Sequence, residues 1–215
     1  RAQAGQTLRE TDIVELFQAR GPDFSAICAA ANELRRDVAG DVASYVVTRN
    51  INYTNICSFK CRFCAFSKGK LSENLRGRPY DLEAEEIATR VREAWERGAT
   101  EVCMQGGIHP HYTGETYLEI CRIAKRAVPQ MHVHAFSPLE VMHGAETLGL
   151  SVSDFLAELK KAGLGTVPGT AAEVLDNDVR AILCPDKLNA DEWLDTIAAA
   201  HSQGLRSTST IMFGH

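Results

Sequence analysis

The chain has 215 residues, of which 45% are hydrophobic, and a formal net charge of −5, a composition typical of a globular protein with a single sizeable core. A mildly acidic chain is a poor candidate for a nucleic-acid binder, because such binders carry a basic face toward the phosphates. No apolar run reaches the roughly 20 residues that cross a bilayer, and residues 1–8 lack a secretory pattern, so we expect a cytoplasmic protein without a membrane partner.

Residues 1–44 are predicted to form a helical extension that precedes the main domain. Apolar side chains recur at helical spacing from residue 11 to residue 39, and Gly21-Pro22 interrupts the pattern. From residue 45 to residue 215, short β-branched runs alternate with amphipathic helical stretches. This alternation indicates a parallel sheet built from βα units.

The main domain is predicted to contain five strands. They lie at residues 45–51, 101–105, 132–136, 165–168 and 207–213. Helices are expected between them, near residues 83–97, 115–127, 153–162 and 189–203. An α/β chain of this kind fits a (β/α)8 TIM-type barrel, but a complete barrel needs about 250 residues. We therefore expect a barrel truncated after about strand five, with two open sheet edges and an uncovered apolar inner face.

Three of the seven cysteines crowd into one loop after the first strand. Cys57, Cys61 and Cys64 have the spacing C-x3-C-x2-C. Three thiolates on one short loop can hold three irons of a 4Fe-4S cluster and leave the fourth iron open to a small molecule. The loop follows a strand, which is where barrels carry their chemistry. A structural zinc-binding module is the alternative, but it needs a fourth soft ligand, and the chain has none at suitable spacing.

Candidate ligand contacts follow the second and third strands. Gln105-Gly106-Gly107 ends the second strand, and paired glycines let the backbone approach a ligand closely. Ser137 and Glu140 follow the third strand at its carboxyl end, where they can hydrogen-bond a cofactor ribose or a substrate. Glu140 is equally typical of the first turn of a helix.

The third and fourth strands supply further polar candidates. Thr170 and Glu173 follow the fourth strand, and a carboxylate there can bind ribose hydroxyls. Arg180 joins them as a candidate, with a surface helix residue as its alternative. His132 and His134 share one face of the third strand, where core or substrate-contacting histidines are favoured over a second metal site.

Five segments of the chain together resemble one family, and the resemblance runs from about residue 10 to residue 215. The segments are Asn52–Cys57, Cys64–Gly69, Met104–Pro110, His132–Ser137 and Pro168–Glu173. They are similar to FO synthase, and more narrowly to its tyrosine-coupling half, the 5-amino-6-(D-ribitylamino)uracil–L-tyrosine 4-hydroxyphenyl transferases of coenzyme F420 biosynthesis. The most discriminating parts are Ser67-Lys68-Gly69 and the stretch from Gly169 to Glu173.

The resemblance implies a radical S-adenosylmethionine (SAM) enzyme whose 4Fe-4S cluster is held by the three cysteines. In this family the glycine pair after the second strand receives the methionyl amine of SAM. Ile108 replaces the acidic residue that often follows the glycines, so the amine contact would rest on backbone carbonyls. The residues expected to contact SAM are Phe66, near the adenine, and Gln105, Gly106, Gly107, Ser137, Glu140, Thr170, Glu173 and Arg180.

The family's reaction is implied in the same way. An electron from a flavodoxin- or ferredoxin-type reductant would cleave SAM, and the resulting 5′-deoxyadenosyl radical would take hydrogen from L-tyrosine. The 4-hydroxybenzyl group would then join 5-amino-6-(D-ribitylamino)uracil. A second FO synthase subunit or fused half would close the deazaflavin.

Two menaquinone-pathway radical SAM enzymes provide the alternative function. Dehypoxanthine futalosine cyclase and aminofutalosine synthase share the pattern Asn-x-Thr-Asn before the cysteines. They typically carry Pro-Gly-Gly-Gly-Ala-Glu where this chain has Pro168–Glu173. That difference favours the tyrosine-coupling transferase.

Overall fold

The computed structural model describes residues 1–59, 61–64 and 78–214. The chain divides into two compact units, Arg1–Tyr45 and Val46–His215. In the described part of the chain, no helix is both long and apolar enough to span a membrane. Phe66 and the Ser67-Lys68-Gly69 segment lie outside the described residues, so the predictions made for them stay predictions.

The Arg1–Tyr45 unit is helical, as predicted. A short 3-10 helix, η1 (Ala2–Ala4), precedes α1 (Glu10–Gln18) and α2 (Pro22–Ala39). The break falls at Gly21, whose φ of 57° favours glycine, and Pro22 then occupies the first turn of α2, where a missing N–H costs no hydrogen bond. No residue of this unit is buried, so the unit taken by itself has no core.

The Val46–His215 unit contains one parallel sheet with the strand order β1-β2-β3-β4-β5. The strands are β1 (Thr48–Asn52), β2 (Glu101–Gln105), β3 (His132–Ala135), β4 (Thr166–Val167) and β5 (Arg206–Ser207). All four strand pairs are parallel, which confirms the predicted βα architecture. The last strand is shorter than predicted. In the described part of the chain beyond Ser207, Glu173 and Ile211 form an isolated bridge, and the Thr208 and Thr210 N–H groups donate to the Val167 and Gly169 carbonyls without forming a named strand.

Six helices connect or follow the strands in the described part of this unit. They are α3 (Ala84–Glu96), α4 (Gly114–Ala127), α5 (Pro138–Leu148), α6 (Val152–Ala162), α7 (Asn177–Leu183) and α8 (Ala190–Ser202). Four of them lie where helical periodicity predicts them. The periodicity does not single out α5 and α7, of which α7 is only seven residues long.

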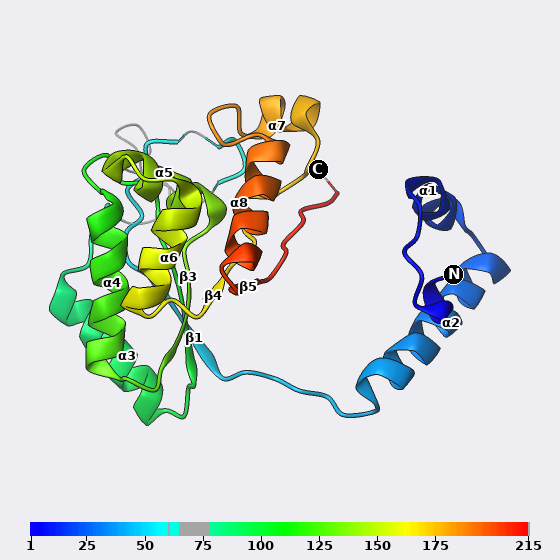
Figure 1. Cartoon of the computed structure of the whole chain (residues 1–215), viewed down its shortest axis with the longest axis horizontal. Coiled ribbons are helices and arrows are strands. Elements are labelled where there is room, and N and C mark those ends of the chain that lie inside the picture. Colours follow the sequence, from blue (N-terminus) through cyan, green and yellow to red (C-terminus); the bar gives the residue numbers. More distant parts are fainter. Residues whose placement is uncertain (60, 65–77, 215) are drawn as a thin grey trace. The chain divides into compact units, whose positions relative to one another are not determined.

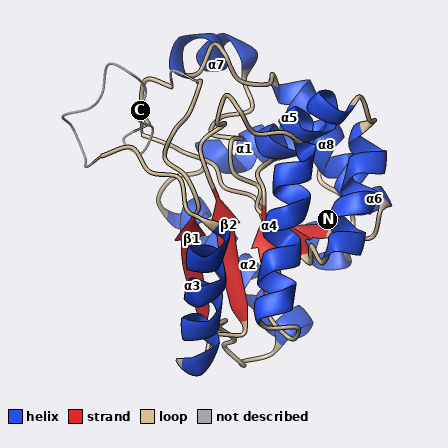
Figure 2. Ribbon diagram, turned by 90° about the vertical axis from the view of Figure 1, so that its left-hand side faces the viewer, coloured by secondary structure: helices blue, strands red, loops and turns tan. Residues whose placement is uncertain are grey.

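The two faces of the sheet differ in polarity because successive strand side chains point to opposite faces. One face packs against the helices through fully buried side chains such as Ile51, Val102 and Val133. Figures 1 and 2 show α3 and α4 covering this face over β1 and β2. The opposite face carries polar side chains, among them Cys103 and His134, so the predicted apolar inner face is wrong. The apolar side chains of these strands therefore lie on the face that the helices cover.

Two glycines let α4, α5 and α6 pack closely. A Cβ atom at Gly114 would lie 2.4 Å from Leu148 Cδ1 and 2.6 Å from the carbonyl oxygen of Gly144. A Cβ atom at Gly144 would lie 2.4 Å from the ring of Phe155, which is completely buried. Neither position has room for a larger residue, since protein cores are packed as densely as crystals.

We expect Gly144→Val to lower the free energy of unfolding of the full-length protein by about 3 kcal/mol, because the added methyl groups would displace the Phe155 ring. Urea unfolding measures this change. Glu146→Val is the matched control. Glu146 is exposed on the same helix, so this variant measures only the effect of the lower helix propensity of valine. An equal loss of stability in both variants would contradict the close packing.

Candidate functional site

The loops at the carboxyl ends of the strands line a cavity of about 210 Å³. Its walls include all three cysteines of the C-x3-C-x2-C motif and seven of the predicted SAM contacts. These seven are Gln105, Gly106, Gly107, Ser137, Glu140, Thr170 and Glu173. Residues from loops that are far apart in the sequence, such as those of Cys57 and Glu173, thus meet at the end of the sheet where parallel αβ proteins bind ligands.

The three cysteines share this cavity but differ in exposure. Cys57 and Cys61 are partly buried, whereas Cys64 is exposed. The Cys57 sulfur accepts a hydrogen bond of 3.3 Å from the Ile108 N–H, and the Cys64 N–H donates to the Cys61 carbonyl at 3.2 Å. Burial raises the pKa of the Cys61 thiol to about 11, against the lowering effect of the nearby Lys187 ammonium. Among the described residues, no three ligand side chains are close enough to hold one metal ion together.

The motif that precedes the cysteines closes the ends of their loop. The Thr54 hydroxyl donates to the Tyr80 carbonyl at 2.8 Å. The Asn55 amide donates to the Arg78 carbonyl at 3.2 Å and accepts from the Tyr80 N–H at 2.8 Å. Sequence reasoning identifies Asn52–Cys57 only as a family signature. The structure shows that its polar side chains fasten the start of the cysteine loop to its end.

The glycine pair after β2 brings the second loop directly against the cysteine loop. A Cβ atom at Gly107 would lie 2.2 Å from the Ile56 carbonyl oxygen and 2.8 Å from Cys57 Cβ. At Gly106 it would lie 2.3 Å from the Tyr53 ring. Both glycines are therefore required by contacts within the protein, whatever ligand the loop also meets. A side chain at position 107 would displace the loop that carries Cys57.

A buried carboxylate, that of Glu140, joins the ends of the first three strands. One oxygen, Oε2, accepts from the Ser137 N–H at 2.7 Å and from the Ser137 hydroxyl at 2.6 Å. The other, Oε1, accepts from the Gly106 N–H at 3.0 Å and from the Tyr53 hydroxyl. Burial raises the pKa of Glu140, while these donors act in the opposite direction. Glu140 thus forms the capping box of α5, and both of its oxygens already have partners.

An ion pair that sequence reasoning missed lies beside the cysteine loop. The Lys187 ammonium donates to Glu173 Oε1 at 2.9 Å, and the two side chains are only 12% and 17% exposed. The same ammonium lies 5.4 Å from the centre of the Phe63 ring, within cation–π range. Both residues line the cavity. Lys187 follows α7 in a stretch without periodicity, so only its place in the fold reveals it.

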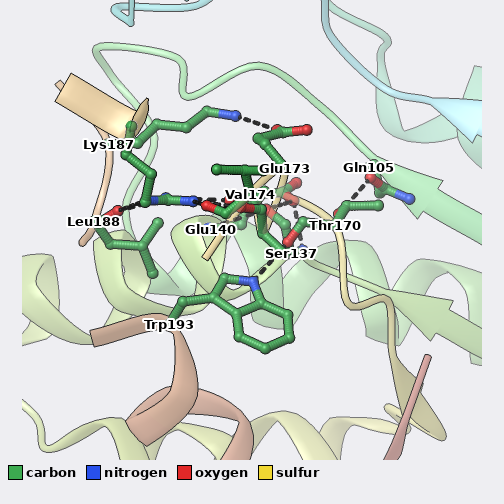
Figure 3. A network of polar contacts seen from close by, with 12 residues as sticks. Gln105, Ser137, Glu140, Thr170, Glu173, Val174, Lys187, Leu188 and Trp193 are labelled. Atoms are coloured by element: carbon green, nitrogen blue, oxygen red, sulfur yellow. Dashed lines mark hydrogen bonds and ion pairs between the residues drawn. The ribbon is translucent and has the colours of Figure 1, made fainter. Parts of the chain in front are cut away.

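The loop after β4 is held in an unusual backbone conformation. Ala171 and Glu173 have φ angles of 61° and 52°, a region that residues with a side chain rarely adopt. The Thr170 hydroxyl donates to Gln105 Oε1 at 3.0 Å, and its carbonyl accepts from the Trp193 indole at 2.9 Å (Figure 3). These contacts hold the loop against β2 and α8, and backbone strain of this kind clusters at functional sites.

Arg180 is buried, so its interpretation as a surface helix residue is wrong. The side chain is 3% exposed and extends from α7 toward the loop after β4. Its guanidinium donates to four backbone carbonyls, those of Ala171, Ala172, Val174 and Leu188. Arg180 is absent from the residues that line the cavity. It therefore supports the loop that carries Thr170 and Glu173.

We expect Glu140→Gln to lower the free energy of unfolding of the full-length protein by about 2–3 kcal/mol although the two side chains have the same shape. Either orientation of the amide turns an N–H donor toward a backbone N–H, that of Ser137 or that of Gly106, and leaves a buried donor without a partner. Urea unfolding checks the value. The control is Glu146→Gln on the exposed side of α5, for which we expect a change below about 0.5 kcal/mol.

Comparison with known proteins relates this chain to one superfamily of enzymes. A sequence model of the radical SAM superfamily matches residues 51–215. The chain is 50% identical over 208 residues to the FO synthase of Streptomyces coelicolor, covering 97% of this chain and 24% of that protein. It is 47% identical over 185 residues to the 5-amino-6-(D-ribitylamino)uracil–L-tyrosine 4-hydroxyphenyl transferase of Archaeoglobus fulgidus, covering 86% of this chain and 52% of that protein.

Solved structures show the same fold at low sequence identity. Methylornithine synthase superposes with a TM-score of 0.70 at 17% identity, covering 97% of this chain and 57% of that chain. The FeFe-hydrogenase maturase HydG from Carboxydothermus hydrogenoformans gives a TM-score of 0.71 at 18% identity, covering 99% and 46%. The chain spans about a quarter of the FO synthase relatives and about half of the archaeal transferase.

Proposed function

The chain belongs to the radical SAM superfamily, and on that premise we propose that it is the cluster-bearing part of an enzyme that couples L-tyrosine to 5-amino-6-(D-ribitylamino)uracil. The observation that carries the proposal is the meeting of all three cysteines of the C-x3-C-x2-C motif with the loops after β2, β3 and β4 in one cavity. The substrate choice is supported by the similarity to the FO synthases and to the archaeal 4-hydroxyphenyl transferase. Fold alone does not choose a substrate.

The donor set of the cavity fits a 4Fe-4S cluster. Cys57, Cys61 and Cys64 offer three thiols from one loop to one cavity, and thiolates are the usual ligands of iron–sulfur clusters. The bound cluster supplies the electron that cleaves SAM reductively. The positive charge of Lys187 favours the thiolate form of Cys61 and so opposes the effect of burial.

The rest of the cavity fits SAM. The loop after β2 offers backbone carbonyls to the methionyl amine, and Glu173 faces the cavity with a carboxylate suited to ribose hydroxyls. Thr170 and Gln105 are hydrogen-bonded to each other, so their side chains have a fixed position before a ligand binds. Ser137 and Glu140 line the same wall, where the Glu140 oxygens serve mainly to fix the loops.

The remaining partners follow from the proposed reaction. A flavodoxin- or ferredoxin-type protein would supply the electron, and a second FO synthase half, fused or separate, would close the deazaflavin ring. Apolar side chains of the cavity wall, among them Phe59, Phe63 and Leu139, would keep water from a reactive radical. The proposed cellular location is the cytoplasm, where thiols remain reduced.

We expect Cys61→Ala to remove most of the iron from the anaerobically reconstituted full-length protein, which should otherwise bind four irons and four sulfides, because the alanine has no thiolate to offer. Iron and sulfide analysis together with visible absorption measures this. Cys28→Ala is the matched control, since Cys28 is exposed in the helical unit and should leave the iron content unchanged. Stoichiometric zinc without iron–sulfur absorption would contradict the cluster and favour the zinc module.

We expect the full-length enzyme, given tyrosine, the ribitylaminouracil, SAM and a reductant, to form 5′-deoxyadenosine together with a covalent hydroxybenzyl–uracil adduct. Mass spectrometry detects both products. Dehypoxanthine futalosine, offered in a separate reaction, should remain unchanged. Its cyclisation with tyrosine left intact would identify the chain as a menaquinone-pathway enzyme instead.

A further inference from the structure

A polar row crosses the sheet on the face opposite to the helices. Asn50 on β1 lies opposite Cys103 on β2, which lies opposite His134 on β3, which lies opposite Thr166 on β4. None of these four side chains carries a formal charge when the histidine is neutral, and burial lowers the pKa of His134. The row ends on β5 at Arg206, which is exposed and charged. These four residues form a polar row without formal charge from β1 to β4, and Glu101, which lies on the same face of β2 beside His132, carries a negative charge.

Two histidines share one hydroxyl group in this row. Thr166 Oγ1 lies 2.7 Å from His134 Nδ1 and 2.8 Å from His132 Nε2. The ring of His132 lies directly over the backbone of Gly165, where a Cβ atom would come within 2.3 Å of it. The geometry is thus fixed by a glycine on one side and a threonine on the other.

The shared hydroxyl couples the two imidazoles. A hydroxyl donates one hydrogen bond, so when Thr166 donates to one neutral histidine, it must accept from the other. The histidine that donates to Thr166 keeps an acceptor at its second nitrogen, and the other histidine keeps a donor there. In either arrangement the group presents one donor and one acceptor, at His134 Nε2 and His132 Nδ1.

The same contacts argue against a metal ion at this place. One nitrogen of each histidine already faces Thr166, and no three ligand side chains of the described residues are arranged to hold a metal. Glu101 Oε2 lies 3.8 Å from His132 Nε2, and its negative charge disfavours an anionic ligand. A hydrogen-bond donor and an acceptor beside this carboxylate suit a neutral ligand with amide and hydroxyl groups.

We propose that this surface binds the ribitylaminouracil, with the His132–Thr166–His134 group hydrogen-bonding its pyrimidinedione ring. The ring offers adjacent amide N–H and carbonyl groups, and the ribityl chain offers hydroxyls to the amide of Asn50. Tyrosine suits the surface less well, because its carboxylate would face the negative charge of Glu101. This assignment rests on the proposed function and extends it to the residues that recognise the second substrate.

The position of the surface relative to the cavity agrees with this role. Gln105 lies on the same face of β2, two residues beyond Cys103, and also lines the cavity proposed for the cluster and SAM. Its amide donates to Cys103 Sγ at 3.5 Å, and its oxygen accepts from Thr170. A ligand held by the histidines would thus extend toward the cavity in which the radical is formed.

The test uses the full-length, cluster-loaded enzyme and two variants. Thr166→Val removes the shared hydroxyl, and His134→Asn keeps an acceptor near the Nδ1 position while removing Nε2. We expect each variant to raise the KM for the ribitylaminouracil, and its Kd in equilibrium dialysis, about 10- to 100-fold, as expected when a polar group loses its partner. The KM for tyrosine should change less than about 2-fold, and Thr166→Ser should restore binding because it restores the hydroxyl.

The outcomes separate the inference from the function on which it rests. If the wild-type enzyme couples the two substrates and both variants bind the uracil normally, the inference is overturned and the function stands. A rise in the KM for tyrosine alone would also overturn it, since the histidines would then contact the other substrate. If the wild-type enzyme neither binds nor converts the uracil, the proposed function fails and the inference fails with it. Iron content and circular dichroism verify that each variant is folded and loaded.

Discussion

The buried carboxylate of Glu140 is the interaction on which the architecture of the site depends. Its two oxygens accept hydrogen bonds from segments that follow β1, β2 and β3, far apart in the sequence. A carboxylate can accept from several donors at once, and in a buried site each donor without a partner would be costly. One side chain therefore sets how three strand ends meet, and with them the loops that carry the cysteines and the glycine pair.

The loops above this carboxylate are held by contacts that leave little freedom. Gly107 touches the backbone of Ile56, and the Asn55 amide fastens the start of the cysteine loop to the Arg78–Tyr80 segment. The loop after β4 is held from one side by Arg180 and from the other by the bond between Thr170 and Gln105. Such fixed surroundings suit radical chemistry, because precise orientation and exclusion of water prevent side reactions.

The sheet divides its two faces between stability and proposed recognition. Apolar side chains such as Ile51, Met104 and Val133 face the helices and form the core. The alternate positions face the other way and carry amide, thiol, imidazole and hydroxyl groups. Because the period of a strand is two residues, a single short segment can serve both purposes. The proposed cofactor cavity and the proposed uracil surface meet at Gln105, which belongs to both.

The sequence by itself determined the βα architecture, the cysteine motif, and the place of four of the six helices in the described part of the Val46–His215 unit, because these depend on local periodicity and spacing. It could not determine the polarity of the inner sheet face, the burial of Arg180, or the Lys187–Glu173 ion pair. Each of these depends on which segments meet in space. Helix α5 shows the same limit. From the sequence, Ser137 and Glu140 fit equally well as a helix cap and as ligand contacts. The hydrogen bonds from Tyr53 and Gly106 to the Glu140 carboxylate, which only the fold brings about, show that Glu140 holds the strand ends together.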